Sequence, residues 1–154
     1  MEKNKKLIPG LPTGFEDRWG KKLYLKKELI KLIEENFIKY GFEPLETPSF
    51  EISSNIGSFL ADDDSNPMSD VFTFNDGEKN ITLRYDLSSP LARFVAQNNQ
   101  ELPLPYKRYA IQNVFRNEKA GNARYREFTQ ADCDIVGNAN PSQSNAELCN
   151  LIAS

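Results

Sequence analysis

The chain has 154 residues, 39% of them hydrophobic and 11% aromatic, which is typical of a globular protein with its own core. Its net charge of −3 argues against a broad basic surface for nucleic acid, and the lack of histidine excludes a histidine base or metal ligand. The two cysteines, Cys133 and Cys149, lack the spacing of a zinc site, so we expect no protein-built metal site. No stretch is apolar enough for a membrane span or a secretory signal, and we expect a cytoplasmic protein.

The first forty residues predict a tail followed by one long helix. Residues 1–12 are a polar tail ending in a Pro/Gly segment, and Thr13-x-x-Glu16 has the spacing of a capping box. From Arg18 to Tyr40 apolar residues recur at spacings of three, four or seven, as in an amphipathic helix. They are Trp19, Leu23, Ile30, Ile33, Phe37 and Tyr40. Gly41 stands where a glycine commonly ends a helix.

A short extended segment and a loop are predicted next. Phe42–Glu51 contains Pro44 and Pro48, which predict an edge strand or a bulge because proline cannot donate to a ladder. The stretch after it has little pattern and holds the acidic run Asp62–Asp64. We interpret that run as a solvated loop.

A hairpin and a second helix follow. Strands at 71–74 and 81–85 flank Asp76-Gly77, which is a strong hairpin signal. Ser88 or Ser89 is expected to cap a helix that reaches about Asn98.

The segment from Tyr106 to Gly137 predicts an antiparallel hairpin that turns near Gly121. Its second strand alternates with period two, so even-numbered and odd-numbered residues point to opposite faces. The even face carries Arg124, Arg126, Phe128, Gln130, Asp132 and Asp134. The odd face includes Cys133, which we interpret as a small buried hydrophobe. Arg116 and Glu118, at the end of the first strand, are expected at the mouth of the even face.

Two interpretations of the even face remain open. A solvated sheet face alternates in the same way, and the pattern alone favours that interpretation. The composition favours a binding site, because arginines, a phenylalanine and a Gln–Asp pair suit an anion beside a flat ring.

The order of helices and hairpins predicts an α+β fold, an antiparallel sheet flanked by helices that pack on one side. A last helix is expected to begin at the Ser144-x-x-Glu147 capping box, with Leu148, Leu151 and Ile152 on its apolar side. Because the sequence stops about two turns later without a C-cap, we expect a piece of a longer chain.

Four stretches of the sequence carry a family resemblance. FRNE (Phe115–Glu118) and RYREFTQ (Arg124–Gln130) resemble motif 2 of the class II aminoacyl-tRNA synthetases. QADCDIVG (Gln130–Gly137) and LRYDLSSPLARFVA (Leu83–Ala96) are similar to the histidyl-tRNA synthetase family. The resemblance extends over the chain from about Pro9.

The resemblance implies the class II catalytic fold in truncated form. Residues 13–154 would be its N-terminal portion, with motifs 1 and 2, while motif 3 and the anticodon-binding domain are absent. The implied reaction is ATP-dependent activation of L-histidine to histidyl-adenylate and transfer to tRNA(His), with ATP and Mg²⁺ as cofactors. The tRNA contacts would lie mostly outside this chain, and the fragment alone is expected to be inactive. The long helix and Pro48 resemble motif 1, which implies a homodimer interface.

The resemblance also implies roles for single residues. Arg116 would be the catalytic arginine that bridges the α-phosphate and the substrate carboxylate. The ATP-binding residues would be Arg116, Glu118 at the adenine, Phe128 stacked beneath the base, and Arg124 and Arg126 near the β- and γ-phosphates. The histidine-binding residues would be Asp86, Ser88 and Gln130 around the α-ammonium group and Asp134 at the imidazole.

Some of these assignments have simpler alternatives. Asp86 suits a helix cap or turn equally well, and Arg124 and Arg126 suit a pair of exposed surface cations. At Asp86 and Asp134 the side chain is one methylene shorter than the glutamate common in the family, so the contact distances stay open.

Two other functions compete with the ligase. One is the regulatory paralogue of ATP phosphoribosyltransferase in histidine biosynthesis, which shares the fold and does not charge tRNA. The complete FRNE and RYREF set favours the enzyme, because a regulatory protein does not need a complete set of residues for binding the phosphates of ATP. The other is a dimerising module without catalysis.

Overall fold

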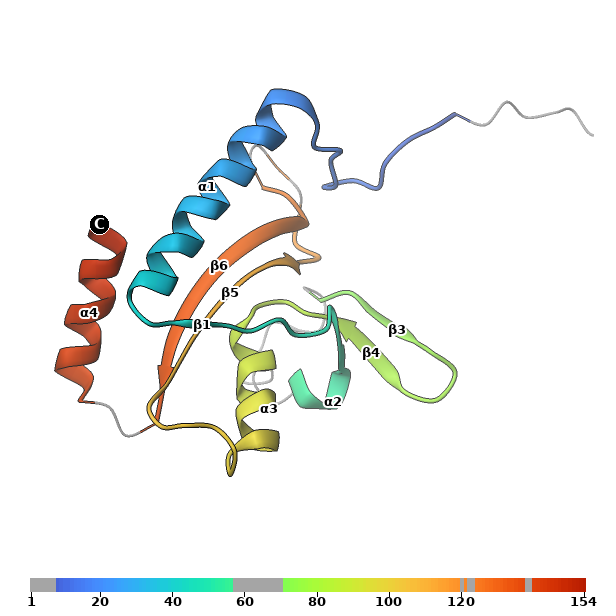
Figure 1. Ribbon diagram of the computed structural model, residues 1–154. Coiled ribbons are helices and arrows are strands. Elements are labelled where there is room, and N and C mark those ends of the chain that lie inside the picture. The colour runs from blue at the N-terminus through green and yellow to red at the C-terminus, as the bar shows by residue number, and fades with distance from the viewer. Residues whose placement is uncertain (1–7, 57–70, 120, 122–123, 138–139) are drawn as a thin grey trace, which may run out of the picture.

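Two antiparallel ten-residue strands, β5 (Tyr106–Phe115) and β6 (Glu127–Val136), run through the centre of the molecule (Figure 1). The structure is a computed structural model, and it describes residues 8–56, 71–119, 121, 124–137 and 140–154. The remaining strands are β1 (Glu43–Pro44), β2 (Phe50–Ile52), β3 (Thr73–Asn75) and β4 (Asn80–Leu83). The helices are α1 (Gly20–Lys39), α2 (Ser53–Ile56), α3 (Ser88–Asn98) and α4 (Pro141–Ala153). The acidic run Asp62–Asp64 lies outside the described residues.

The strands form two small sheets, with the orders β1-β5-β6 and β2-β4-β3. All pairs are antiparallel except β1, which runs parallel to β5 at the edge. The α+β prediction is therefore confirmed. The edge-strand prediction for Phe42–Glu51 is confirmed: β1 ends at Pro44 at the edge of the first sheet, and β2 begins at Phe50 at the edge of the second sheet. The exposed Pro48 lies in the link between them, where no ladder hydrogen bond is needed.

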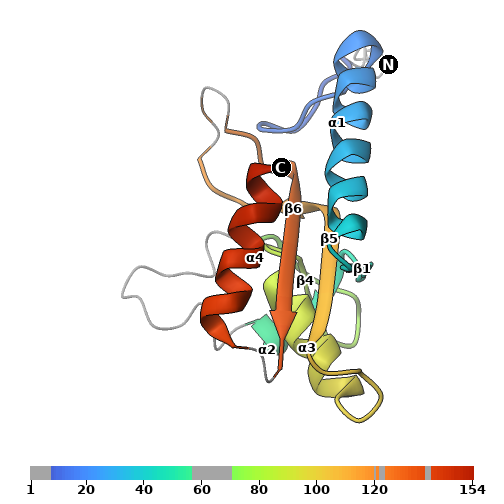
Figure 2. The ribbon, with the colours of Figure 1, turned by 60° about the vertical axis from the view of Figure 1, so that its left-hand side comes forward.

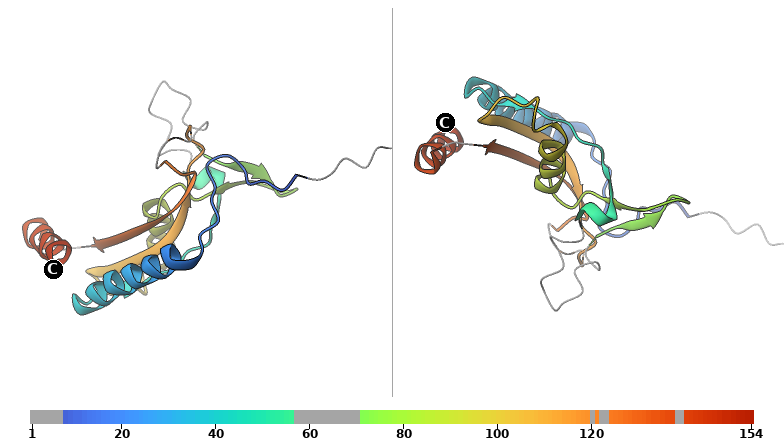
Figure 3. Two further views of the ribbon diagram at one scale, coloured as in Figure 1. Left: turned by 90° about the horizontal axis from the view of Figure 1, so that it is seen from above. Right: turned by 90° about the horizontal axis from the view of Figure 1, so that it is seen from below.

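Helices cover both faces of the long hairpin, which corrects the one-sided arrangement expected from the sequence (Figures 2 and 3). The odd face packs against α1 and α4 through a core of Phe37, Phe42, Tyr109 and Leu151. The even face packs against the start of α3 through Leu87, Ala110 and Val114, with Phe128 at the margin. The half-buried Cys133 packs against the first core, as expected, and burial raises the pKa of its thiol.

Helix α1 ends as predicted but does not begin as predicted. Gly41 has φ 77°, its N–H bonds to Ile38 O at 2.9 Å, and the N–H of Phe42 bonds to Phe37 O at 3.0 Å. These two bonds are the Schellman pattern that a C′ glycine permits. The helix starts at Gly20 after the N-cap Trp19, which makes no side-chain cap bond, so the Thr13-x-x-Glu16 box is wrong.

The other two long helices do not begin at the serines expected from the sequence. The N-cap of α3 is Leu87, which makes no side-chain cap bond. One residue earlier, the carboxylate of Asp86 accepts bonds from Ser89 N and Ser89 Oγ, both at 3.2 Å, in agreement with the turn role considered for it. Asn140 caps α4, accepting from Ser142 N at 3.0 Å, with Pro141 at the first position. The cap predicted at Ser144 is therefore four residues late.

Apolar side chains remain exposed on α1. The predicted stripe is half-buried or buried from Leu23 to Tyr40, whereas Trp19 is exposed. A second stripe, formed by Leu25, Leu29 and Leu32, is 56–61% exposed and was missed. On α4, Leu148 and Leu151 pack inward, but Ile152 is 79% exposed, contrary to expectation.

The predicted β3–β4 hairpin is confirmed, and Asp76 organises its turn by accepting bonds from the N–H groups of Glu78 and Lys79. Gly77 in this turn has φ 105°, a conformation that favours glycine. Among the described residues, no helix combines the length and the apolar character that a membrane crossing needs.

Candidate functional site

The register of the central hairpin determines which side chains share the candidate site. Phe128 pairs with Val114, Gln130 with Gln112, and Asp134 with Arg108, so the even residues of β5 and β6 face the same way. The predicted alternation is confirmed over β6. Arg124 and Arg126 come before the strand begins. Arg116 follows β5 directly and extends the pairing, since its N–H bonds to Arg126 O at 2.9 Å.

A hollow of about 300 Å³ opens where the two strands meet their connecting loop. It is lined by Arg116, Glu118, Arg124, Tyr125 and Phe128. Four of the five residues assigned to ATP therefore surround one hollow. The fifth, Arg126, lies beside it.

Arg116 is held in place by a ring on each of two neighbouring segments. Its Cζ lies 4.4 Å from the ring centroid of Tyr85 and 5.1 Å from that of Phe128. Its Nε donates to the carbonyl of Tyr85 at 3.3 Å. Both ring contacts lie within the range of cation–π attraction. The hollow therefore has a fixed planar cation at its edge.

Glu118 connects the two sides of the hollow. Its carboxylate forms an ion pair with Arg124 and accepts a hydrogen bond from the Tyr85 hydroxyl at 3.3 Å. Its carbonyl accepts from Arg126 Nε at 2.9 Å. Arg126 is half-buried and bound to the loop backbone, unlike an exposed surface cation, whereas the side chain of Arg124 is 65% exposed.

A second group of polar residues continues along the same face of β6. Gln130 donates to both carboxylate oxygens of Asp132 at 3.0 Å, and Asp134 pairs with Arg108. Asp134 is six residues from Phe128, or roughly 20 Å along a strand. The face thus has a cationic end at the hollow and an acidic end near α3.

Burial raises the pKa of the Asp134 carboxyl, the cation of Arg108 lowers it, and the nearby Asp132 raises it further.

The segment from Arg84 to Leu87 lies beside this face and connects its two ends. The carbonyl of Arg84 accepts from Phe115 N at 2.9 Å, that of Tyr85 accepts from Arg116, and that of Leu87 accepts from Arg108 at 3.1 Å. Asp86 is therefore placed next to the face while its carboxylate binds Ser89 in the first turn of α3. Ser88 is exposed in the first turn of α3.

Three residues of the site were missed by the sequence analysis. Tyr85 supports Arg116 and Glu118, and Arg108 supports Asp134. Arg84 is buried and donates to the carbonyls of Asn113 and Thr47 at 2.6 and 2.7 Å, which joins the two sheets. Of these three residues, only Arg108 had a signal in the sequence: it occupies an even-numbered position of β5, on the same face as Asp134.

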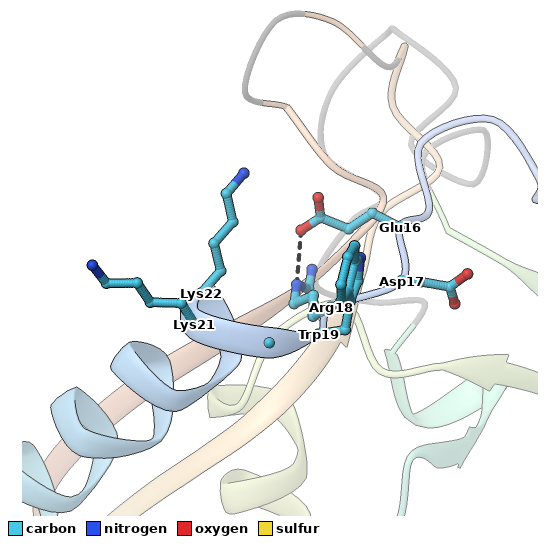
Figure 4. A pocket seen from close by; sticks show the side chains of 7 residues that line it. Glu16, Asp17, Arg18, Trp19, Lys21 and Lys22 are labelled. Atoms are coloured by element: carbon cyan, nitrogen blue, oxygen red, sulfur yellow. Dashed lines mark hydrogen bonds and ion pairs between the residues drawn. The ribbon is translucent and has the colours of Figure 1, made fainter.

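Another hollow, of about 380 Å³, lies at the start of α1 and is lined by residues 16–22 (Figure 4). Figure 4 shows the Glu16–Arg18 ion pair on one side, with Lys21 and Lys22 directed away from it. Because its lining is one continuous segment, this hollow does not gather groups from distant parts of the sequence. It is not the candidate site.

The cationic hollow fits phosphate better than it fits a metal ion. No group of three or more acidic, cysteine or histidine side chains comes together within the described parts of the chain. The nearest acid, Glu118, is already paired with Arg124. Any divalent ion would have to be held largely by the phosphates of a bound nucleotide.

Comparison with known proteins gives one family. The family model described as "tRNA synthetases class II core domain (F)" matches residues 16–151. The chain is 82% identical to a histidine–tRNA ligase of Pelagibacter ubique over 100% of its own length and 33% of that protein. It is 44% identical to a histidine–tRNA ligase of Rhodopseudomonas palustris, covering 99% of this chain and 29% of the relative. The chain thus spans about a third of the length of these relatives.

Solved structures agree on the fold. Histidyl-tRNA synthetase from Nostoc sp. PCC 7120 superposes with a TM-score of 0.74 at 27% identity, covering 94% of this chain and 34% of that one. An ATP phosphoribosyltransferase regulatory subunit/histidyl-tRNA synthetase from Bacillus halodurans gives 0.79 at 24% identity, covering 99% and 38%. At this lower identity the likeness concerns the fold alone.

Proposed function

Because this chain belongs to the class II tRNA synthetase core-domain family, we propose that it is the part of a histidine–tRNA ligase that activates histidine with ATP. The observation that carries the proposal is the placement of Arg116 over Phe128 at the edge of a hollow also lined by Glu118 and Arg124. The relatives named histidine–tRNA ligase support the choice of amino acid.

In the proposed first step, a carboxylate oxygen of histidine attacks the α-phosphorus of ATP and pyrophosphate leaves. Negative charge grows on the phosphoryl oxygens, and fixed positive charge stabilises that transition state. Arg116 supplies it, since its planar fork can hold an oxygen of each reactant. The contacts with Tyr85 and Phe128 orient this fork before the substrates arrive.

The other residues of the hollow would bind the nucleotide. Phe128 offers a flat face to the adenine, and Glu118 keeps acceptor capacity for its amino group while paired with Arg124, because a carboxylate has about four acceptor sites. Arg124 and Arg126 would meet the β- and γ-phosphates. Mg²⁺ would enter with the ATP, on its phosphates, and share the neutralisation of their charge.

The acidic end of the face would bind the amino acid. Asp86, Ser88 and Gln130 would surround the α-ammonium group, and Asp134 would accept an N–H of the imidazole ring. A site that hydrogen-bonds polar atoms of its substrate rejects amino acids without them by about 10⁴ or more. The second step, transfer to tRNA(His), would use parts of the protein beyond this chain.

The partners and setting follow from the same proposal. The full protein would be a cytoplasmic homodimer, with motif 1 (α1 and the link at Pro48) at the interface. The exposed Leu25, Leu29 and Leu32 stripe supports this, because a monomer rarely exposes a continuous apolar strip.

Histidine-dependent exchange of pyrophosphate into ATP, measured on the full-length protein, tests the activity. We expect exchange with histidine and none with other amino acids. Absence of both exchange and tRNA charging would reject the ligase and favour a regulatory protein of the same fold.

A further inference from the structure

A buried arginine lies beneath the acidic end of the candidate site. The side chain of Arg108 is 0% exposed, and its Nη2 lies 2.6 Å from Oδ2 of Asp134. The same Nη2 donates to the carbonyl of Leu87 at 3.1 Å. Its Nε and Nη1 are buried and have no hydrogen-bond partner within the described part of the chain. The guanidinium thus contacts Asp134 and the Leu87 carbonyl through one nitrogen, while its other two nitrogens make no hydrogen bond within the described residues.

Packing alone does not explain an arginine at this position. Burying a guanidinium with unpaired N–H groups is costly, and apolar residues of similar volume commonly stabilise a core as well or better. The two adjacent positions on this face, Tyr106 and Ala110, belong to the buried hydrophobic core. The arginine therefore requires a reason other than core stability.

The ion pair involves only one of the two carboxylate oxygens of Asp134, Oδ2. Oδ2 is buried and forms an ion pair with Arg108, without the geometry of a hydrogen bond, while the Asp134 side chain as a whole remains 37% exposed. The carboxylate is thereby fixed at one oxygen and accessible from the side of the site. Arg108 also opposes the effects of burial and of Asp132, which both disfavour the charged form of this acid.

We propose that Arg108 is a positioning residue for recognition of the amino-acid side chain: it holds Asp134 as an oriented carboxylate that accepts the ring N–H of histidine. This inference rests on the proposed function. Arg108 does not touch the substrate. It acts through Asp134, and it belongs to the amino-acid end of the face, away from the ATP hollow.

The test uses four forms of the full-length protein: wild type, Arg108→Met, Asp134→Asn and the double variant. Dissociation constants for histidine and for ATP are measured separately by calorimetry. We expect Arg108→Met to weaken histidine binding about tenfold or more, because the buried Oδ2 of Asp134 loses the cation that orients it, while ATP affinity changes less than about twofold. In the Asp134→Asn background the same substitution should cause little further loss, because the two residues act as a unit. Arg108→Lys should recover part of the histidine affinity.

Three outcomes would overturn the proposal: unchanged histidine affinity in Arg108→Met, equal weakening of histidine and ATP, or additive losses in the double variant. If Arg108→Met does not fold, Arg108→Gln replaces it in the same cycle, since glutamine removes the charge and keeps a polar group at this position. The exchange activity of the wild type distinguishes failure of the proposed ligase function from failure of the proposed role of Arg108. Its absence rejects the ligase itself, whereas normal exchange with an unaffected Arg108 variant rejects the positioning role alone.

Discussion

The guanidinium carbon of Arg116 lies 5.1 Å from the centroid of the Phe128 ring. The two residues come from opposite strands of the central hairpin, and both line the hollow at its loop end. A planar cation and a flat ring are therefore available in one place, as binding of a nucleotide requires.

We expect Arg116→Ala to lower the turnover of histidine-dependent exchange by about 10²–10³, because one preorganised donor to the transition state is lost. The affinity for histidine should fall far less than the turnover in the same variant. Arg116→Lys keeps the charge but not the planar fork of the guanidinium. Its turnover should therefore lie between those of the wild type and Arg116→Ala. Equal losses in turnover and in histidine binding would make Arg116 a general binding or structural residue.

Phe128→Leu separates stacking from packing. Leucine can still pack against Leu87, Ala110 and Val114, so the melting temperature should change little. Because the flat face is lost, the affinity for ATP should fall about tenfold, in line with the energy of base stacking on an aromatic ring. Phe128→Tyr is the matched control and should retain ATP binding. Similar ATP affinity in the leucine variant would mean that the ring fills the core only.

Tyr109 gives a prediction of pH dependence in the core. Burial and the hydrogen bond to Glu34, at 2.8 Å, raise the pKa of its hydroxyl to about 12. A raised pKa means that the folded state holds the proton more tightly than the unfolded state. The resulting stability is full below about pH 10, the ordinary tyrosine pKa, and is lost as the pH rises through about 12.

Tyr109→Phe should therefore flatten the decline in the free energy of unfolding across that alkaline range. At neutral pH the substitution should lower the free energy of unfolding by about 1.5–3 kcal/mol, through loss of a hydrogen bond to a carboxylate. Denaturant unfolding at several pH values measures both effects. An ultraviolet titration of tyrosinate should also lack one late-ionising group in the variant. Parallel pH profiles for the two proteins would contradict the assignment.

The exposed leucine stripe of α1 predicts the dimer interface. We expect Leu29→Glu to weaken dimerisation of the full-length protein at least about tenfold, because it puts a charge into a desolvated apolar contact. Lys27→Glu, exposed on another side of the same helix, serves as the control and should dimerise normally. Sedimentation velocity over a range of concentrations measures the change. An unaffected dimer would place the interface elsewhere.

Local pattern predicted the secondary structure well where a single strong signal was present. Gly41 and the Asp76-Gly77 turn behave as expected, because a left-handed residue or an Asx turn is specified within a few positions. Helix starts were poorly predicted. Asp86 binds the first turn of α3, and Asn140 caps α4, in place of Ser88 and Ser144, since several candidate side chains stood close together and sequence spacing does not choose among them.

The sequence by itself determined that Phe128, Gln130, Asp132 and Asp134 share a face, because parity along a strand settles the direction of each side chain. Tertiary structure alone decided that Arg108 lies beneath Asp134 and that Tyr85 supports Arg116. Those pairs join residues 26 to 31 positions apart in the chain. Their contact depends on strand register and on the path of the segment after β4, both of which are fixed by packing of the whole fold and not by any local pattern.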